Sequence, residues 1–352
     1  MIRIRIVSIA AVLALTAALV SLPSLVAVRA QESKPPASNQ QKTDKDKKPA
    51  ADEGAQDDQP LKLGTQLVTV PFNVTDRTNR YVNDLSKADL EVLEDNKPQE
   101  VFSFERQTEL AITIAMLIDI SGSEEYSLPM EKAAGRRFFE RVLRPRKDLG
   151  AVVTFEGEAT LIQGLTGDAP KLQRALDEIR IAVPAASVRG VGGTPPINGD
   201  SRAGSTAIWD AVYSVSTDLL HREAGRRVII LITDGMDTSS TVKFRDAIQR
   251  TWRSEVIVYA IGIGDPAFGV STGDLKKITT ETGGRAFFPR NEEDLDRAFA
   301  QIDEDLRSQY VVAYTPANGA KDGSFRTIQL RVKNRKELNV RHRRGYFAPK
   351  SS

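Results

Sequence analysis

The sequence of 352 residues contains no cysteine and only two histidines. The missing cysteines exclude a disulfide framework and leave no thiol for a lipid anchor. We expect His221, at a predicted helix end, and His342, in a basic tail, to be surface residues rather than general bases. Charge of one sign is not in excess either, because 49 Lys and Arg face 47 Asp and Glu. The net charge of +2 does not mark the chain as a nucleic-acid binder.

Residues 1–30 have the pattern of an export signal. Arg3 and Arg5 precede the apolar run 6–20, and the small-residue pattern at 28–30 predicts cleavage after Ala30. The alternative is an uncleaved membrane anchor, because the apolar run approaches the roughly 20 residues that span a bilayer. Either way, we expect an exported protein that is periplasmic, at the cell surface or secreted.

The segments on either side of the central part of the chain lack the sequence pattern of amphipathic helices. Residues 31–60 are rich in Lys, Asp, Gln, Ala and Pro, which predicts a disordered linker. Short alternating apolar patterns predict strands in residues 61–108 and again in residues 309–352. Pro71 suggests an edge position for its strand. We expect the two strand segments to meet in one small β subdomain.

Residues 109–308 alternate apolar strands with amphipathic helices. Strands are predicted at residues 111–119, 150–155, 159–163, 227–233, 256–263 and 285–288. Helices are predicted at residues 129–143, 170–181, 207–220, 242–252, 275–282 and 292–307. This alternation predicts an α/β fold with a doubly wound, mostly parallel sheet flanked by helices.

Oxygen-bearing side chains gather at three places next to the predicted elements, two after strands and one at the start of a helix. The first group, Asp119, Ser121 and Ser123, ends a very apolar strand; Thr206 opens a helix, and Asp234 ends a second apolar strand. Ligands of parallel sheets bind at the carboxyl edge, so these oxygens are expected to meet there. Oxygen ligands of this kind suit Mg²⁺, or another divalent cation such as Mn²⁺ or Ca²⁺. Without the metal, the two facing acids would repel each other.

The three pieces DISGS (119–123), GSTA (204–207) and ITDG (232–235) resemble the metal-ion-dependent adhesion site (MIDAS) of von Willebrand factor A-type (VWA) domains. The flanking segments are similar to those of the bacterial VWFA-related family frequent in acidobacterial genomes. The resemblance implies a VWA domain over 109–308 that binds Mg²⁺ and captures a protein ligand presenting a carboxylate. It also implies direct metal contacts for Ser121, Ser123 and Thr206, and contacts through water for Asp119 and Asp234.

Three features near this site extend the hypothesis. Glu125 or Asp200 could cap the metal from within the chain, which would make the site closed or structural. The Gly- and Pro-rich stretch 183–204 is expected to be a specificity loop. Asp237 is interpreted as a solvated loop residue rather than an outer ligand of the metal.

Two other function classes stay as alternatives. A Mg²⁺-dependent hydrolase or phosphotransferase is disfavoured because Asp119 lacks a second aspartate two residues on and no G-x-x-x-x-G-K-[ST] loop occurs. An envelope protein that binds polyanions would use the basic tail, namely Arg331, Lys333, Arg335, Lys336, Arg341, Arg343 and Arg344. Aromatic residues are not interleaved there as stacking platforms require, so no nucleic-acid partner is expected. The favoured hypothesis is a non-enzymatic adhesion or scaffold protein.

Overall fold

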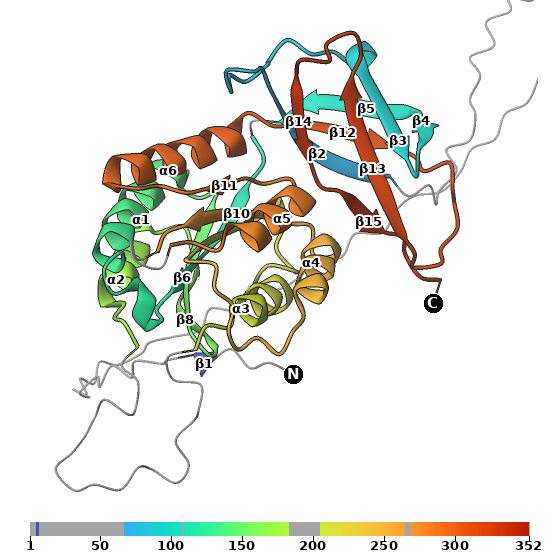
Figure 1. The fold of residues 1–352 in the computed structure, drawn as a ribbon. Coiled ribbons are helices and arrows are strands. Elements are labelled where there is room, and N and C mark those ends of the chain that lie inside the picture. Colours follow the sequence, from blue (N-terminus) through green and yellow to red (C-terminus); the bar gives the residue numbers. More distant parts are fainter. Residues whose placement is uncertain (1–4, 7–66, 108, 183–204, 265–268, 352) are drawn as a thin grey trace, which may run out of the picture. The chain divides into compact units, whose positions relative to one another are not determined.

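The computed structural model describes residues 5–6, 67–107, 109–182, 205–264 and 269–351 (Figure 1). The expected linker, the 183–204 loop, Asp200 and nearly all of the expected export signal lie outside these ranges. Within them, no helix combines the length and the apolar character needed to cross a bilayer.

A mostly parallel sheet forms the centre of the α/β part. Its strands are β1 (Arg5–Ile6), β6 (Ile112–Asp119), β7 (Leu149–Phe155), β8 (Ala159–Thr166), β9 (Arg226–Thr233), β10 (Val256–Gly262) and β11 (Ala286–Phe287). They lie in the order β1-β8-β7-β6-β9-β10-β11, and β8 runs antiparallel to β7 while the other five pairs are parallel. The predicted fold class is therefore confirmed.

Helices cover both faces of this sheet (Figure 1). They are α1 (Leu128–Val142), α2 (Ala169–Glu178), α3 (Ile208–Ser214), α4 (Phe244–Arg253), α5 (Thr272–Thr282) and α6 (Glu292–Arg307). A 3₁₀ turn, η2 (Gly122–Glu124), follows β6, and α3 continues as a π-helical turn, η4 (Val215–Leu219).

The alternation of side chains along β6 explains the two layers. Ile114 and Met116 pack into a core with α1, α2 and α6, whereas Ala115 and Leu117 pack into a second core with α3, α4 and α5. Side chains of consecutive strand residues point to opposite faces, so a strand covered on both faces is apolar throughout. All eight residues of β6 are buried, including its last residue, Asp119.

The two flanking segments pair with each other in two antiparallel sheets. Their elements are β2 (Val68–Thr75), η1 (Lys87–Asp89), β3 (Leu90–Glu94), β4 (Lys97–Gln99), β5 (Val101–Arg106), β12 (Tyr310–Tyr314), β13 (Phe325–Val332), β14 (Asn339–His342) and β15 (Gly345–Phe347). The orders are β14-β2-β12-β5 and β15-β13-β3-β4, with one apolar cluster shared by both sheets. Each sheet thus combines strands from both ends of the chain.

The edge position expected for the strand of Pro71 is wrong, because β2 lies between β14 and β12. Pro71 pairs with Val311 of β12, while β14 pairs only with residues Phe72–Thr75. The proline therefore stands just beyond the end of β14, where no ladder bond is required of its missing N–H.

Candidate functional site

The strand order reverses at β6, which has β7 on one side and β9 on the other. Ligands of doubly wound sheets bind at this switch point, beyond the carboxyl ends of the strands. Asp119 is the last residue of β6, and Asp234 directly follows β9. Because Ile118 pairs with Ile232, the two strands deliver both acids to the same edge of the sheet.

Asp119 is held by hydrogen bonds to both of its carboxylate oxygens. Oδ1 accepts the Ser121 N–H at 3.0 Å, and Oδ2 accepts the Thr233 hydroxyl at 2.6 Å. The side chain is fully buried, and burial raises its pKa to about 6 although both hydrogen bonds act to lower it. The carboxylate is fixed in place at a substantial electrostatic cost.

Of the two predicted serines, Ser121 contacts Asp119, and Ser123 contacts Ser121. Ser121 is buried and Ser123 is exposed, and their hydroxyl oxygens are 3.1 Å apart. Ser121 stands at the start of the 3₁₀ turn η2 and Ser123 lies within it, so it is this turn, rather than an extended segment, that brings the two hydroxyls together. Both hydroxyls keep lone pairs that could bind a cation.

Asp234 begins a tight turn that depends on the glycine after it. Its Oδ1 accepts the Met236 N–H at 2.9 Å, and its carbonyl accepts the Ser271 N–H at 2.8 Å. Gly235 has φ +78°, and a Cβ there would lie 2.4 Å from the Ser271 carbonyl oxygen. Only glycine therefore allows the chain to turn here and keep Asp234 at the sheet edge.

Thr206 is attached through its backbone to the loop that Asp234 begins. Its N–H donates to the Thr238 hydroxyl at 2.8 Å, and its carbonyl accepts the N–H groups of Thr238 and Ser239. Asp237 has a different role from the one expected for a solvated residue. Its Oδ1 accepts the N–H of Ile208 at 2.9 Å and so caps the start of α3.

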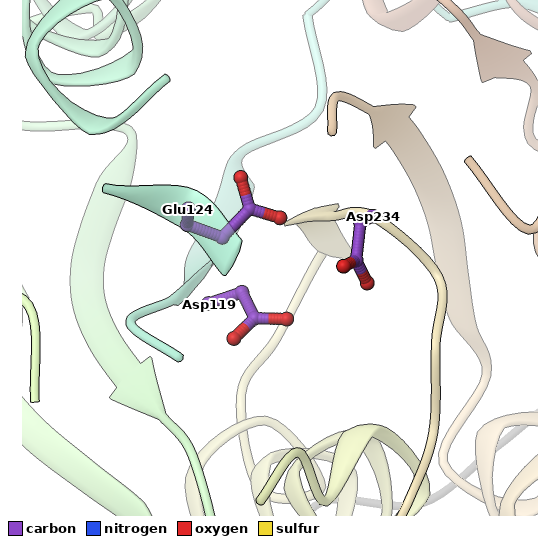
Figure 2. A group of neighbouring side chains, drawn as sticks. All are labelled: Asp119, Glu124 and Asp234. Carbon is purple, nitrogen blue, oxygen red and sulfur yellow. The ribbon is translucent and has the colours of Figure 1, made fainter. Parts of the chain in front are cut away.

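Glu124 joins the site, although the sequence directed attention to its neighbour Glu125. The carboxylates of Asp119, Glu124 and Asp234 are buried, and each offers an oxygen within 4.8 Å of the others (Figure 2). Glu125 is exposed and lines a surface hollow next to α1 and α2. The internal cap expected of Glu125 is thus not placed at the site, whereas an acid one residue earlier is.

A second buried acid stands behind Glu124. Glu131 of α1 is fully buried, and neither of its carboxyl oxygens has a hydrogen-bond partner among the described residues. Burial, and then the charge of Glu131, raise the pKa of Glu124 well above its ordinary value. Burial likewise raises the pKa of Glu131.

The donor set fits a divalent cation. Three buried carboxylates and two adjacent hydroxyls are hard oxygen ligands, the type that Mg²⁺, Mn²⁺ and Ca²⁺ take. Glu124 Oε1 is buried without a hydrogen-bond partner among the described residues, which a bound cation would correct. The three carboxylates would otherwise repel one another in a site of low dielectric constant.

The two histidines and the basic tail residues, which an enzyme or a polyanion-binding protein would use, have other surroundings in the structure. His221 is exposed as expected, but the His342 ring is half-buried and accepts the Leu330 N–H at 3.2 Å. Four of the seven basic tail residues form ion pairs, namely Arg331 with Glu91, Arg335 with Asp84, Arg341 with Asp305, and Arg343 with Glu255.

A G-x-S-x-G pattern, the nucleophile motif of α/β-hydrolases, occurs at residues 269–273. That motif works on a sharp turn between a strand and a helix, with a histidine as base. Here β10 already ends at Gly262, and Ser271 is exposed before α5. Among the described residues, no hydrogen bond joins the Ser271 hydroxyl to a histidine, so the arrangement of a nucleophile elbow is missing there.

Two family models described as von Willebrand factor type A domain match the chain, one over residues 114–236 and one over residues 197–301. Together they cover the α/β part from β6 to α6. A search of curated proteins gave no match.

Several solved structures are similar to the chain. Proximal thread matrix protein 1 from the mussel byssus is 19% identical over 61% of this chain and 51% of its own, with a TM-score of 0.47. The chain therefore spans about half the length of that protein. A form of it with a zinc-occupied MIDAS motif gives a TM-score of 0.46 at 19% identity, over 59% and 48% of the two chains. A von Willebrand factor type A protein from Catenulispora acidiphila is 16% identical over 74% and 76%, with a TM-score of 0.45.

Proposed function

Because the chain contains a von Willebrand factor type A domain, we propose that this domain binds a divalent cation and thereby captures an acidic side chain of a partner protein. The observation that carries the proposal is the meeting of the buried Asp119 and Asp234 carboxylates at the switch point of the sheet. Among the described residues, neither acid forms an ion pair with Lys or Arg. A cation from solution would supply the missing positive charge.

The residues that would hold the ion divide into two groups. Ser121, Ser123 and Thr206 would offer neutral oxygens, while Asp119 and Asp234 would balance its charge. Mg²⁺ is the favoured ion, with Mn²⁺ and Ca²⁺ as alternatives. The bound ion would supply a Lewis-acidic centre that accepts a carboxylate oxygen. Thr233 and the Ser121 amide hold Asp119 in the orientation this requires.

We place the protein outside the cytoplasm, in the periplasm, at the cell surface or secreted, because of the signal-like residues 1–30. In this role the protein is an adhesion or scaffold protein rather than an enzyme. The ion-paired arginines of the tail and the position of Ser271 favour this function over the polyanion-binding and hydrolase alternatives.

Capture of a partner tests the proposal. The protein would be used as bait in an envelope extract, with Mg²⁺ or with EDTA, beside Asp119→Ala and the control Asp246→Ala. Asp246 is exposed at the start of α4. We expect a protein retained by the wild type and by Asp246→Ala to be released by EDTA and missed by Asp119→Ala. When the acidic residues of the captured partner are replaced one by one, a single replacement should abolish capture. Capture that is insensitive to EDTA and to Asp119→Ala would refute the mechanism.

A further inference from the structure

The Glu124 side chain is directed into the metal site by the turn that carries it. The 3₁₀ turn η2 begins directly after Ser121 and folds Glu124 back over the end of β6. Its carboxylate lies beside those of Asp119 and Asp234, each of which comes from the end of a different strand (Figure 2). Glu124 is fully buried, so its carboxylate cannot be solvated by bulk water.

The hydrogen bonds of Glu124 leave one oxygen for the ion. Oε2 accepts the Ser127 hydroxyl at 2.5 Å, whereas Oε1 is buried with no hydrogen-bond partner among the described residues. A buried carboxylate oxygen without a partner is costly, unless a group outside the protein chain satisfies it. The adjacent Glu131 adds a second acid and supplies no positive charge.

We infer that Glu124 is a third, internal carboxylate ligand of the divalent cation and takes the coordination position otherwise open to the partner's carboxylate. The inference rests on the metal site of the proposed function and goes beyond it, because it concerns access to that site. Glu124 thus acts as a built-in competitor of the partner.

Charge explains why a third carboxylate matters. Asp119 and Asp234 together balance a divalent ion, so that an incoming carboxylate is the first excess negative charge. With Glu124 also bound, the site is already negative by one, and a further carboxylate is repelled. A partner must therefore displace Glu124, and its apparent affinity is lowered by the cost of that displacement.

Mn²⁺ bound to the purified protein reports this arrangement without any partner. Water proton relaxation would give the number of waters bound to the ion, and titration with acetate would give its access to a carboxylate. In Glu124→Gln we expect one additional bound water, Mn²⁺ affinity lowered by about tenfold, and acetate binding at lower concentration than in the wild type. Glu125→Gln, which changes the exposed neighbour, should match the wild type in all three measurements.

Ser127→Ala provides a second variant that leaves every proposed ligand in place. It removes the hydroxyl that holds Glu124 Oε2, so we expect bound water to increase in the same direction but by less. If Glu124→Gln does not fold, Ser127→Ala alone tests whether Glu124 is a ligand of the ion. If both variants bind Mn²⁺ with the same number of bound waters and the same acetate affinity as the wild type, Glu124 is not a ligand of the ion. The proposed function would not be affected by this result. A wild-type protein that binds no Mn²⁺ would overturn both.

Discussion

The carboxyl edge of the α/β sheet and the interior of the β subdomain both bury acidic side chains, but with different partners. In the β subdomain, Glu94 accepts the hydroxyls of Tyr314 and Tyr346 at 2.8 and 2.9 Å, and the guanidinium of Arg326 lies 3.4 Å away. At the carboxyl edge of the α/β sheet, the described residues provide no such cation for Asp119 or Asp234. The first arrangement is complete within the chain, while the second lacks a positive charge.

This difference separates a structural use of buried charge from a functional one. A buried acid with its own arginine and hydroxyl donors holds two sheets in one geometry. A group of buried acids without a counter-charge costs stability until a cation arrives. The two regions should therefore respond in opposite ways to substitution and to metal.

Loss of Glu94 should damage stability most. Glu94→Ala leaves the buried Arg326 guanidinium without its carboxylate, so the free energy of unfolding should fall by about 3–5 kcal/mol. Urea unfolding measures this. Glu91→Ala on the same strand is the control, because its pair with Arg331 is exposed and should contribute less than about 1 kcal/mol. Mn²⁺ affinity should not change in either variant, and a loss of affinity in Glu94→Ala would break the distinction between the regions.

Asp119→Ala should have the opposite profile. Removing one of the carboxylates that balance the ion should lower Mn²⁺ affinity by at least about 100-fold, measured by titration calorimetry. The metal-free variant should be no less resistant to urea than the wild type, because the cost of burying the Asp119 carboxylate, and then its repulsion from Asp234, are removed. Retained Mn²⁺ affinity would show that the ion, if bound, lies elsewhere.

Thr233→Val tests the orientation of Asp119 without removing a charge. The variant keeps the shape of the side chain and loses the hydroxyl that donates to Asp119 Oδ2 and accepts the Gly235 N–H. We expect about a tenfold loss of Mn²⁺ affinity, as for other groups that orient a ligand. Thr251→Val is the matched control, because that buried hydroxyl donates only to the Ile248 carbonyl of its own helix. Equal Mn²⁺ affinity in the two variants would remove Thr233 from the site.

The metal-free protein should lose stability as the pH rises. Burial raises the pKa values of Glu124 and Glu131 above their ordinary 4.5, so the native state holds protons that the unfolded chain releases. The free energy of unfolding then falls between about pH 5 and about pH 9. In EDTA, Glu131→Gln should recover part of this loss, raising the melting temperature at the higher pH by a few degrees, at about 2–4 °C per kcal/mol. A melting temperature that rises with pH would contradict the raised pKa values.

The fold was largely predictable because its signals are local and repeated. The alternation of apolar strands and amphipathic helices gave the element order of the α/β part, and two family models confirm the VWA resemblance. The place of Pro71 was not predictable, because a proline next to the end of a short partner strand has the same sequence signature as one on an edge strand.

The site was only partly predictable for a related reason. The sequence predicted Asp119 and Asp234, which the structure brings together. It did not show which of the adjacent Glu124 and Glu125 lies at the site, because this depends on the 3₁₀ turn that buries Glu124 and exposes Glu125. Glu131 did have a signal, because it falls on the stripe of α1 that buries Leu128, Ala134 and Phe138. An acid at such a position is a candidate for function.

A crystal structure of the protein grown with Mn²⁺ would show whether Asp119 and Asp234 hold a divalent cation. The anomalous signal of manganese locates the ion independently of any assumed ligand. We expect one peak at the carboxyl edge of the sheet, about 2.0–2.5 Å from oxygens of the predicted site. No peak beside Asp119 and Asp234 in crystals where Mn²⁺ is bound elsewhere, or not at all, would contradict it.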